Sequence, residues 1–308
     1  MKDYTHFLTK DKIIFTTRGN IHPKGFIRSA ALYRNIKEGS RKLENLLFDK
    51  EVDEFGTKWV YKTNPSYVKN DKYGRYILVP EEDIVKSFDP FSKEVQERVK
   101  LALENSVWGT LFRNLTKLIP IEDIGFIGSF LMGFSTKESD LDIVVRGKKN
   151  LEIIKNNFKE LLKTLKAINV PKEDIIDISL KKYYSIYNKN ENDFRKMMER
   201  RWSTIVTKDY MLKIRFSYKE SEIDEIIPKI KQREAIVEGQ VIDDTGVDFM
   251  PRSFKLKSKN KEYLVQTYFW DFTYCVKKGD IIKVKAYLFD NKVLYLCEPE
   301  KHGIKFTS

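Results

Sequence analysis

Hydrophobic and polar positions divide the chain into three regions with different periods. Residues 1–88 contain short apolar runs between Gly, Asn and Pro, including "KIIFTTRGN", "GFIRSAALYRN", "KWVYKTN" and "RYILVP". Runs of this kind, rich in β-branched and aromatic residues, predict strands. We therefore expect an N-terminal β-rich domain over residues 1–88.

After residue 88 the pattern takes the period of a helix. Apolar residues recur every four positions from Val95 to Leu111 within "KEVQERVKLALENSVWGTLFRNLTKL", which predicts one helix that ends before Pro120. Either Asp89, with Pro90 at the first helical position, or Ser92 is placed to cap its start.

The next segments predict a small sheet covered by helices. "IGFI", "LDIVV" and "DYMLKIRFSY" have strand patterns, and "NLEIIKNNFKELLKTLKAI" has one apolar helical face. That face should pack on the sheet. We expect an α/β (α+β) core over residues 89–233.

From residue 234 onward the pattern contains only strands. Five short runs follow one another: "AIVEGQVIDD", "SFKLKS", "EYLVQTYFW", "DIIKVKAYLFD" and "KVLYLCEP". Five strands of this length suit a small closed barrel, and an OB-like barrel is the natural expectation for residues 234–308.

One predicted strand carries acids that an apolar strand does not need. Asp140 and Asp142 are two residues apart, so in an extended strand they project from the same face about 7 Å apart. Neighbouring carboxylates repel and favour a cation, and oxygen ligands suit Mg²⁺ or Mn²⁺ bound together with substrate phosphates. Upstream, Gly128 and Ser129 allow close approach of a phosphate. Alternatively, Asp140 serves a turn and Asp142 pairs with a basic residue of the neighbouring strand.

The combination of Gly-Ser after one strand and Asp-x-Asp in the next resembles the signature of the DNA polymerase β nucleotidyltransferase superfamily, hG[GS] followed by DhDh. The resemblance implies a mixed sheet that binds a nucleoside triphosphate (NTP) and two divalent metals. Gly128 and Ser129 would hold the β- and γ-phosphates, and Asp140 and Asp142 the metals. An acceptor oxygen would attack the α-phosphorus, and pyrophosphate would leave.

A wider resemblance involves "IHPKGFIR", "YGRYILVPEEDI" and the C-terminal β-domain. These segments look like an archaeal family described as nucleotidyltransferases or polymerase β-like proteins, which implies an archaeal source.

The superfamily normally places a third carboxylate on a neighbouring strand. Here "MLKIRFSY" instead has Lys213, Arg215 and Ser217 on one face, and the nearest candidate acids are Asp209 and Asp177. If neither acid reaches the metals, the protein binds a nucleotide without efficient turnover, or Lys213 and Arg215 hold the triphosphate.

The charge balance points to a polyanionic partner. The 308 residues include 57 Lys and Arg against 45 Asp and Glu, a net charge of +12. RNA is the expected acceptor, although a Lys-rich surface of a heat-adapted protein has a similar balance. "RKMMERRW" is either a phosphate-tracking surface or a solvated helix face with Met197 and Met198 in the core. The residues of the first interpretation are Arg195, Lys196, Arg200, Arg201 and Trp202. The aromatic residues of "YLVQTYFWDFTY" either stack bases or fill the barrel core.

Other residue types narrow the class of protein. Cys275 and Cys297 are the only cysteines, and we expect buried reduced thiols rather than a disulfide. His6, His22 and His302 are far apart and show no metal-ligand spacing, which disfavours a His-based metal site or a Ser-His-Asp hydrolase. No apolar run has the length of a signal peptide core or a membrane span, so we expect a cytoplasmic protein.

We therefore expect a metal-dependent nucleotidyltransferase that acts on RNA. The alternatives are a catalytically degenerate relative that binds nucleic acid or regulates, and an enzyme that modifies a protein or small molecule.

Overall fold

The structure is a computed structural model. It describes residues 1–50, 58–105, 108–135, 139–167, 192, 195, 200, 202–207, 211–224, 226–269, 276–298 and 301–307. The chain forms two compact units, each made of three segments. Unit 1 comprises Met1–Val52, Val79–Asn169 and Ser203–Ile223, and unit 2 comprises Asp53–Leu78, Val170–Trp202 and Asp224–Ser308. The division into domains at residues 88 and 233 stays a prediction.

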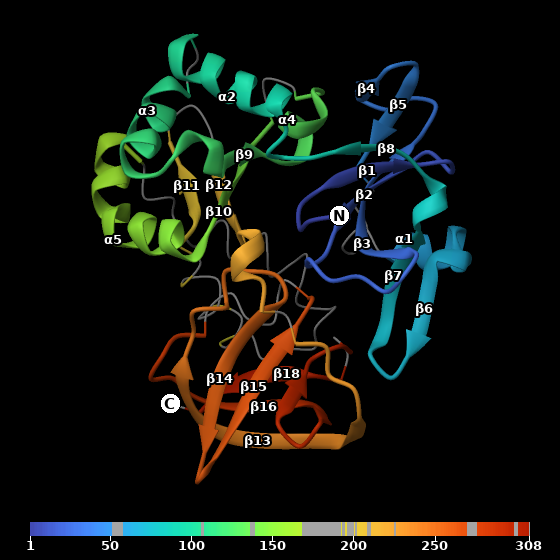
Figure 1. Cartoon of the computed structure of the whole chain (residues 1–308), viewed down its shortest axis with the longest axis vertical. Helices are drawn as coiled ribbons and strands as arrows, with labels where there is room; N and C mark the ends of the chain where they lie inside the picture. The colour runs from blue at the N-terminus through green and yellow to red at the C-terminus, as the bar shows by residue number, and fades with distance from the viewer. Residues whose placement is uncertain are drawn as a thin grey trace. The chain divides into compact units, whose positions relative to one another are not determined.

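The N-terminal part of unit 1 is an antiparallel sheet, in agreement with the predicted β-rich region. Its strands lie in the order β4-β5-β3-β2-β1-β8. Their bounds are β1 His6–Thr9, β2 Ile13–Thr17, β3 Phe26–Asn35, β4 Arg41–Leu43, β5 Leu46–Asp49 and β8 Ile84–Phe88 (Figure 1). Phe7 and Phe15 are fully buried, and their rings stack with centroids 5.6 Å apart.

The prediction of a strand at "KWVYKTN" is wrong, because Lys58–Thr63 forms helix α1. Trp59 and Val60 are both buried although they are adjacent, and Thr63 Oγ1 donates to the Trp59 carbonyl. Burial of consecutive residues removes the alternation that favours a strand, and short apolar runs do not distinguish the two structures. The 3₁₀ helix η2 (Pro65–Tyr67) and the hairpin of β6 (Val68–Asp71) and β7 (Gly74–Pro80) follow.

The long helix expected before Pro120 is two helices, α2 (Lys93–Asn105) and α3 (Gly109–Leu118). Ser92 caps α2, because its Oγ accepts from the Val95 amide at 3.4 Å. Arg113 of α3 donates to the Leu103 carbonyl at 2.7 Å, which satisfies a group at the C-terminal end of α2. A Cβ on Gly109 would lie 3.1 Å from the same carbonyl, so a glycine suits this close approach.

The second sheet of unit 1 is mixed and has the order β11-β12-β10-β9. Its strands are β9 Ile124–Phe126, β10 Leu141–Arg146, β11 Thr204–Val206 and β12 Met211–Ser217. Helix α4 (Gly128–Met132) lies between β9 and β10, and α5 (Lys148–Thr164) follows β10 (Figure 1). Leu151, Ile154 and Leu161 of α5 are buried and the helix contacts β10, which confirms the predicted packing.

Three further 3₁₀ helices are η3 (Glu81–Asp83), η4 (Ile121–Asp123) and η5 (Glu220–Glu222).

Unit 2 contains a closed five-stranded barrel, as the five predicted strands require. Its strands are β13 Lys231–Asp243, β14 Arg252–Ser258, β15 Lys261–Thr267, β16 Ile281–Phe289 and β17 Val293–Tyr295. They pair in the order β13-β14-β15-β17-β16, and β16 pairs with β13 to close the barrel. Only the β15–β17 pair is parallel. An additional strand, β18 (Gly303–Phe306), pairs with β16.

The β6–β7 hairpin belongs to unit 2 as far as Leu78, and it packs on the barrel through Tyr73. The Tyr73 ring stacks on Phe289 at 5.7 Å and meets the edge of Tyr295 at 6.0 Å. Its hydroxyl donates to the Pro228 carbonyl at 2.7 Å. Segments far apart in the sequence therefore share one apolar cluster.

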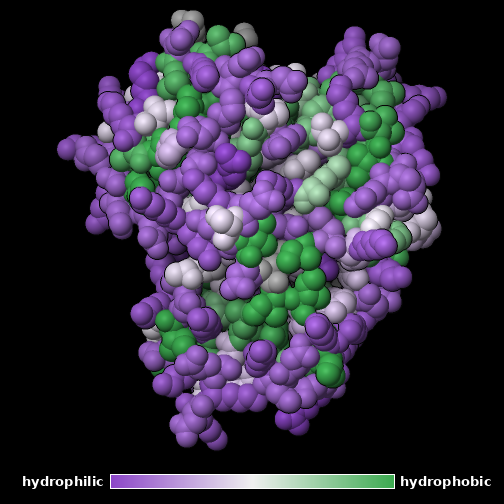
Figure 2. Space-filling view, viewed as in Figure 1, coloured by the Kyte–Doolittle hydropathy of each residue, from purple (hydrophilic) through white to green (hydrophobic). Residues whose placement is uncertain are grey.

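Hydrophilic residues predominate on the face shown in Figure 2, as expected for a chain in which 33% of residues are charged. Among the helices that the structure describes, none has the length and apolar character needed to cross a membrane.

Candidate functional site

Strand β10 presents the two acids as the sequence predicts. Asp142 in the strand and Asp140 just before it are partly exposed, whereas Leu141 and Ile143 are fully buried. The alternation results from the two-residue period of a strand. Asp140 and Asp142 therefore lie on the solvent-accessible side, while their neighbours anchor the strand in the core.

The neighbouring strand β12 places a cation beside the acids. β10 and β12 are parallel, and Asp142 lies in register with Lys213. The Lys213 ammonium forms an ion pair with Asp140. The sequence alternative placed such an ion pair at Asp142, whereas the structure forms it at Asp140. Within the described residues, Asp142 forms no ion pair.

The third carboxylate stays unassigned. Asp209 and Asp177 both lie outside the described residues. On the described face of β12, Arg215 and Ser217 are buried, with 7% and 4% of their surface exposed. Lys213, which is partly exposed, is therefore the β12 side chain that meets the acid pair.

Gly128 lies directly against Asp142. Its φ is +63°, and a Cβ added there would be 3.2 Å from Asp142 Oδ2. Glycine adopts this left-handed backbone without steric cost and leaves the space beside the carboxylate open. Ser129, the next residue, is buried. The predicted turn and the predicted acid pair therefore come together in the fold.

His6 fixes the turn from the N-terminal sheet, a contact that the sequence did not reveal. The Gly128 amide donates to His6 Nε2 at 2.9 Å across 122 positions of the chain. His6 is 2% exposed, and burial lowers its pKa to about 3. The ring is therefore neutral near pH 7, with Nε2 unprotonated as an acceptor requires. No spacing or motif indicates this contact.

The N-terminal sheet also brings cations toward the acids. The Lys50 ammonium and the Arg41 guanidinium lie 5.8 and 5.5 Å from the centre of the Tyr33 ring. Lys50 as a whole is exposed, but burial of its ammonium lowers its pKa. The positive charges of Lys213 and Arg41 lower the pKa further. The negative charges of Asp142 and Asp140 partly oppose this shift.

Tyr33 itself is 1% exposed, and burial raises its pKa to about 12. It is a neutral platform beneath the two cations. Tyr33 packs against Phe134 at 5.1 Å, so the two cations lie on a buried ring.

The donor set suits a hard divalent cation that keeps part of its hydration shell. Among the residues the structure describes, no three His, Cys, Asp or Glu side chains gather into a metal site. Mg²⁺ commonly binds through one or two carboxylates and completes its shell with water and phosphate oxygens. Asp140, Asp142 and the open space at Gly128 fit that requirement.

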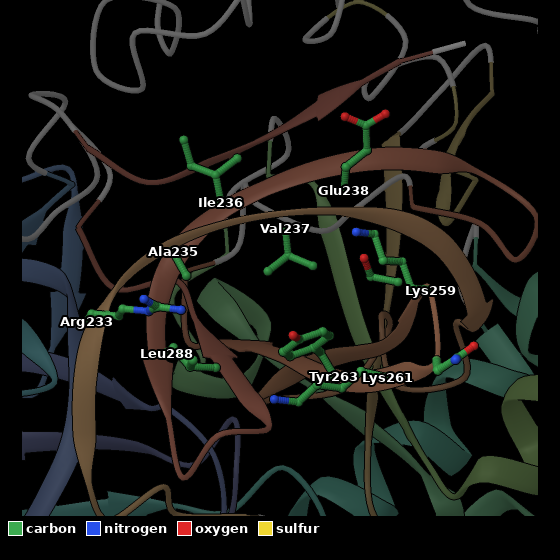
Figure 3. Close-up of a pocket in the computed structure, with 11 residues that line it drawn as sticks. Arg233, Ala235, Ile236, Val237, Glu238, Lys259, Lys261, Tyr263 and Leu288 are labelled. Carbon is green, nitrogen blue, oxygen red and sulfur yellow. The ribbon is translucent and has the colours of Figure 1, made fainter.

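A pocket of about 710 Å³ lies in the barrel. Strand β13 and the β14–β15 hairpin form most of its lining, which includes the cations Arg233, Lys259 and Lys261. Figure 3 shows Val237 and Tyr263 pointing toward each other across the pocket. The Lys261 ammonium lies 5.0 Å from the centre of the Tyr263 ring, and the lining also includes Glu238. Aromatic rings beside cations are used by proteins that bind single-stranded nucleic acid.

The basic segment "RKMMERRW" has a partly structural role. Arg200 of "RKMMERRW" forms a 2.5 Å ion pair with Asp280, and its guanidinium lies 5.1 Å from the centre of the Phe306 ring. Lys196 and Arg201 of the same segment lie outside the described residues.

In the barrel, Tyr268 and Phe269 pack against core clusters, which favours the core interpretation for these two aromatic residues. Cys297 is a buried free thiol whose pKa burial raises to about 12, whereas Cys275 lies outside the described residues.

Residues 110–262 match the family model described as a nucleotidyltransferase domain. The matched range contains the turn at Gly128, the acid pair and strand β12, and it extends into the barrel. Searches of curated proteins and of solved structures found no match. The archaeal source stays a prediction.

Proposed function

We propose that this chain, whose residues 110–262 match the nucleotidyltransferase domain model, is a transferase of the DNA polymerase β type that transfers a nucleoside monophosphate from an NTP to RNA. The proximity of Gly128 to Asp142 carries the proposal. Of the two acids, Asp142 forms no ion pair in the described residues, and it borders the space that a glycine keeps open.

The chain's own residues have distinct roles in this reaction. Asp140 and Asp142 would hold Mg²⁺ or Mn²⁺, and the turn at Gly128 and Ser129 would receive the β- and γ-phosphates. Lys213, which pairs with Asp140, lies where it could also bind a phosphate oxygen. The metals would supply electrostatic stabilisation for attack of an acceptor oxygen on the α-phosphorus with release of pyrophosphate.

Two features support RNA as the acceptor. The net charge of +12 favours a polyanion. We infer that the closed five-stranded barrel is OB-like, and its pocket contains Arg233, Lys259, Lys261 and Tyr263. OB-like barrels bind single-stranded nucleic acid through cations and aromatic rings.

Labelled NTP, Mg²⁺ and total RNA test the activity directly. We expect the wild-type protein to transfer label to RNA, and Asp142→Asn to lower transfer at least about 100-fold because it removes a metal-binding charge. Asp224→Asn removes an exposed carboxylate outside the pair and serves as the matched control. Unchanged transfer by Asp142→Asn would contradict the proposal, and label found on protein would identify a different acceptor.

Lys213 favours a second candidate function, a nucleotide-dependent RNA-binding protein without turnover. The lysine occupies the face of β12 that adjoins the acids, and it forms an ion pair with one of them. Calorimetry separates the two candidates from a protein that does not bind nucleotides. Binding of Mg²⁺-NTP without transfer supports the second candidate, and transfer supports the first.

A further inference from the structure

The N-terminal sheet contacts the turn that begins at Gly128. His6 accepts from the Gly128 amide at 2.9 Å, and Phe134, just after α4, meets the edge of the Tyr33 ring at 5.1 Å. Met132 belongs to the same buried cluster as Tyr33. These contacts lie within unit 1, so side chains of the N-terminal sheet have a defined position beside the acids.

Two basic residues of the N-terminal sheet region, Arg41 and Lys50, contact the same aromatic ring. Arg41 lies on β4, opposite Phe48, and Lys50 directly follows β5. Both side chains lie on Tyr33, and Asp49 binds Arg41 at 3.1 Å. The Nε of Arg41 is buried and has no hydrogen-bond partner in the described part of the chain.

Three basic and three acidic side chains interact around the acid pair. Lys50, Arg41 and Lys213 oppose Asp140, Asp142 and Asp49. A divalent cation at the acid pair would add positive charge beside three basic side chains. An anion is then required close by, and the phosphates of an NTP supply it.

We propose that Lys50 and Arg41 bind the terminal phosphates of the NTP, so that the N-terminal sheet forms one wall of the nucleotide site. This inference rests on the proposed function and assigns part of its substrate recognition to residues outside the family match, which begins at residue 110. The cations complement the turn at Gly128, whose amide is engaged by His6.

Calorimetry with Mg²⁺ and either an NTP or the matching nucleoside monophosphate tests the assignment. We expect Lys50→Met to weaken NTP binding about tenfold and to leave monophosphate binding unchanged, because only the NTP carries the terminal phosphates. Lys50→Arg should retain NTP affinity. Lys42→Met removes an exposed cation from the same hairpin and is the matched control.

The outcomes distinguish the two claims. If Lys50→Met and Arg41→Gln bind NTP like the wild type while Asp142→Ala does not, this assignment is wrong and the proposed function stands. If the wild-type protein binds no NTP, both fail. Equal loss of NTP and monophosphate binding would also overturn the assignment, because it would indicate a structural effect.

Discussion

Gly128 determines how much space Asp142 has. Its backbone is left-handed, and a side chain there would approach Asp142 Oδ2 to 3.2 Å. Gly133, five residues later, is also left-handed, with φ +74°, but a Cβ there would meet nothing within 4 Å. A side chain at Gly133 would therefore strain only the backbone, whereas one at Gly128 would also crowd Asp142.

We expect Gly128→Ala and Gly133→Ala each to lower the free energy of unfolding by about 1 kcal/mol, because both force a side chain into a left-handed conformation. Only Gly128→Ala should weaken Mg²⁺-NTP binding. Urea denaturation and calorimetry measure the two effects. Equal nucleotide affinity in both variants would show that the space beside Asp142 is not used.

At the scale of elements, Asp123 connects the parts of the sheet that carries the site. It lies in η4 before β9 and is 3% exposed. Its carboxylate binds Lys219 at 2.6 Å and Arg146 at 3.4 Å, and it accepts from Asn150 at 2.8 Å. These partners lie after β12, at the end of β10 and in α5. One carboxylate therefore joins three elements.

Removal of this carboxylate should destabilise the fold. We expect Asp123→Ala to lower the free energy of unfolding by about 3 kcal/mol, the lower end for a broken buried ion pair, because Lys219 and Arg146 still reach water. Glu122→Ala, at the exposed neighbouring position, should change it by less than about 0.5 kcal/mol. Urea denaturation provides both values, and similar losses in the two variants would refute the role of Asp123.

Elements that depend on neighbouring residues in the chain could be predicted from the sequence. Apolar and polar residues alternate within each barrel strand, and Gly128, Asp140 and Asp142 lie within one short stretch of sequence. The break between α2 and α3 depends on the contact of Arg113 with the end of the preceding helix, which periodicity does not contain. His6 and Lys50 were missed for the same reason, because the fold brings them to the site from distant segments.

At the scale of the whole molecule, both units contain a histidine that is neutral when folded. Burial lowers the pKa of His6 in unit 1 to about 3, and it lowers those of His22 in unit 1 and His302 in unit 2 to about 4. His302 Nδ1 accepts from the amides of Cys297 and Glu298 at 3.1 and 3.2 Å, so protonation there would break both bonds.

Stability should therefore fall as pH decreases below about 6.5, because the unfolded chain binds protons that the folded chain excludes. Each histidine contributes a slope of about 1.4 kcal/mol per pH unit between its unfolded and folded pKa values. In urea denaturation between pH 6 and pH 5, His302→Asn should reduce the slope, since its amide oxygen still accepts but does not titrate. An unchanged slope would exclude His302 as a source.

The β6–β7 hairpin also bears on how the chain folds during translation. Tyr73 is synthesised early, whereas Phe289 and Tyr295, the rings on which it packs, are made only after the last segment of unit 1. Nascent chains fold in order of emergence from the ribosome. Unit 1 can be completed before unit 2, so the contacts of Tyr73 with Phe289 and Tyr295 form only near the end of synthesis.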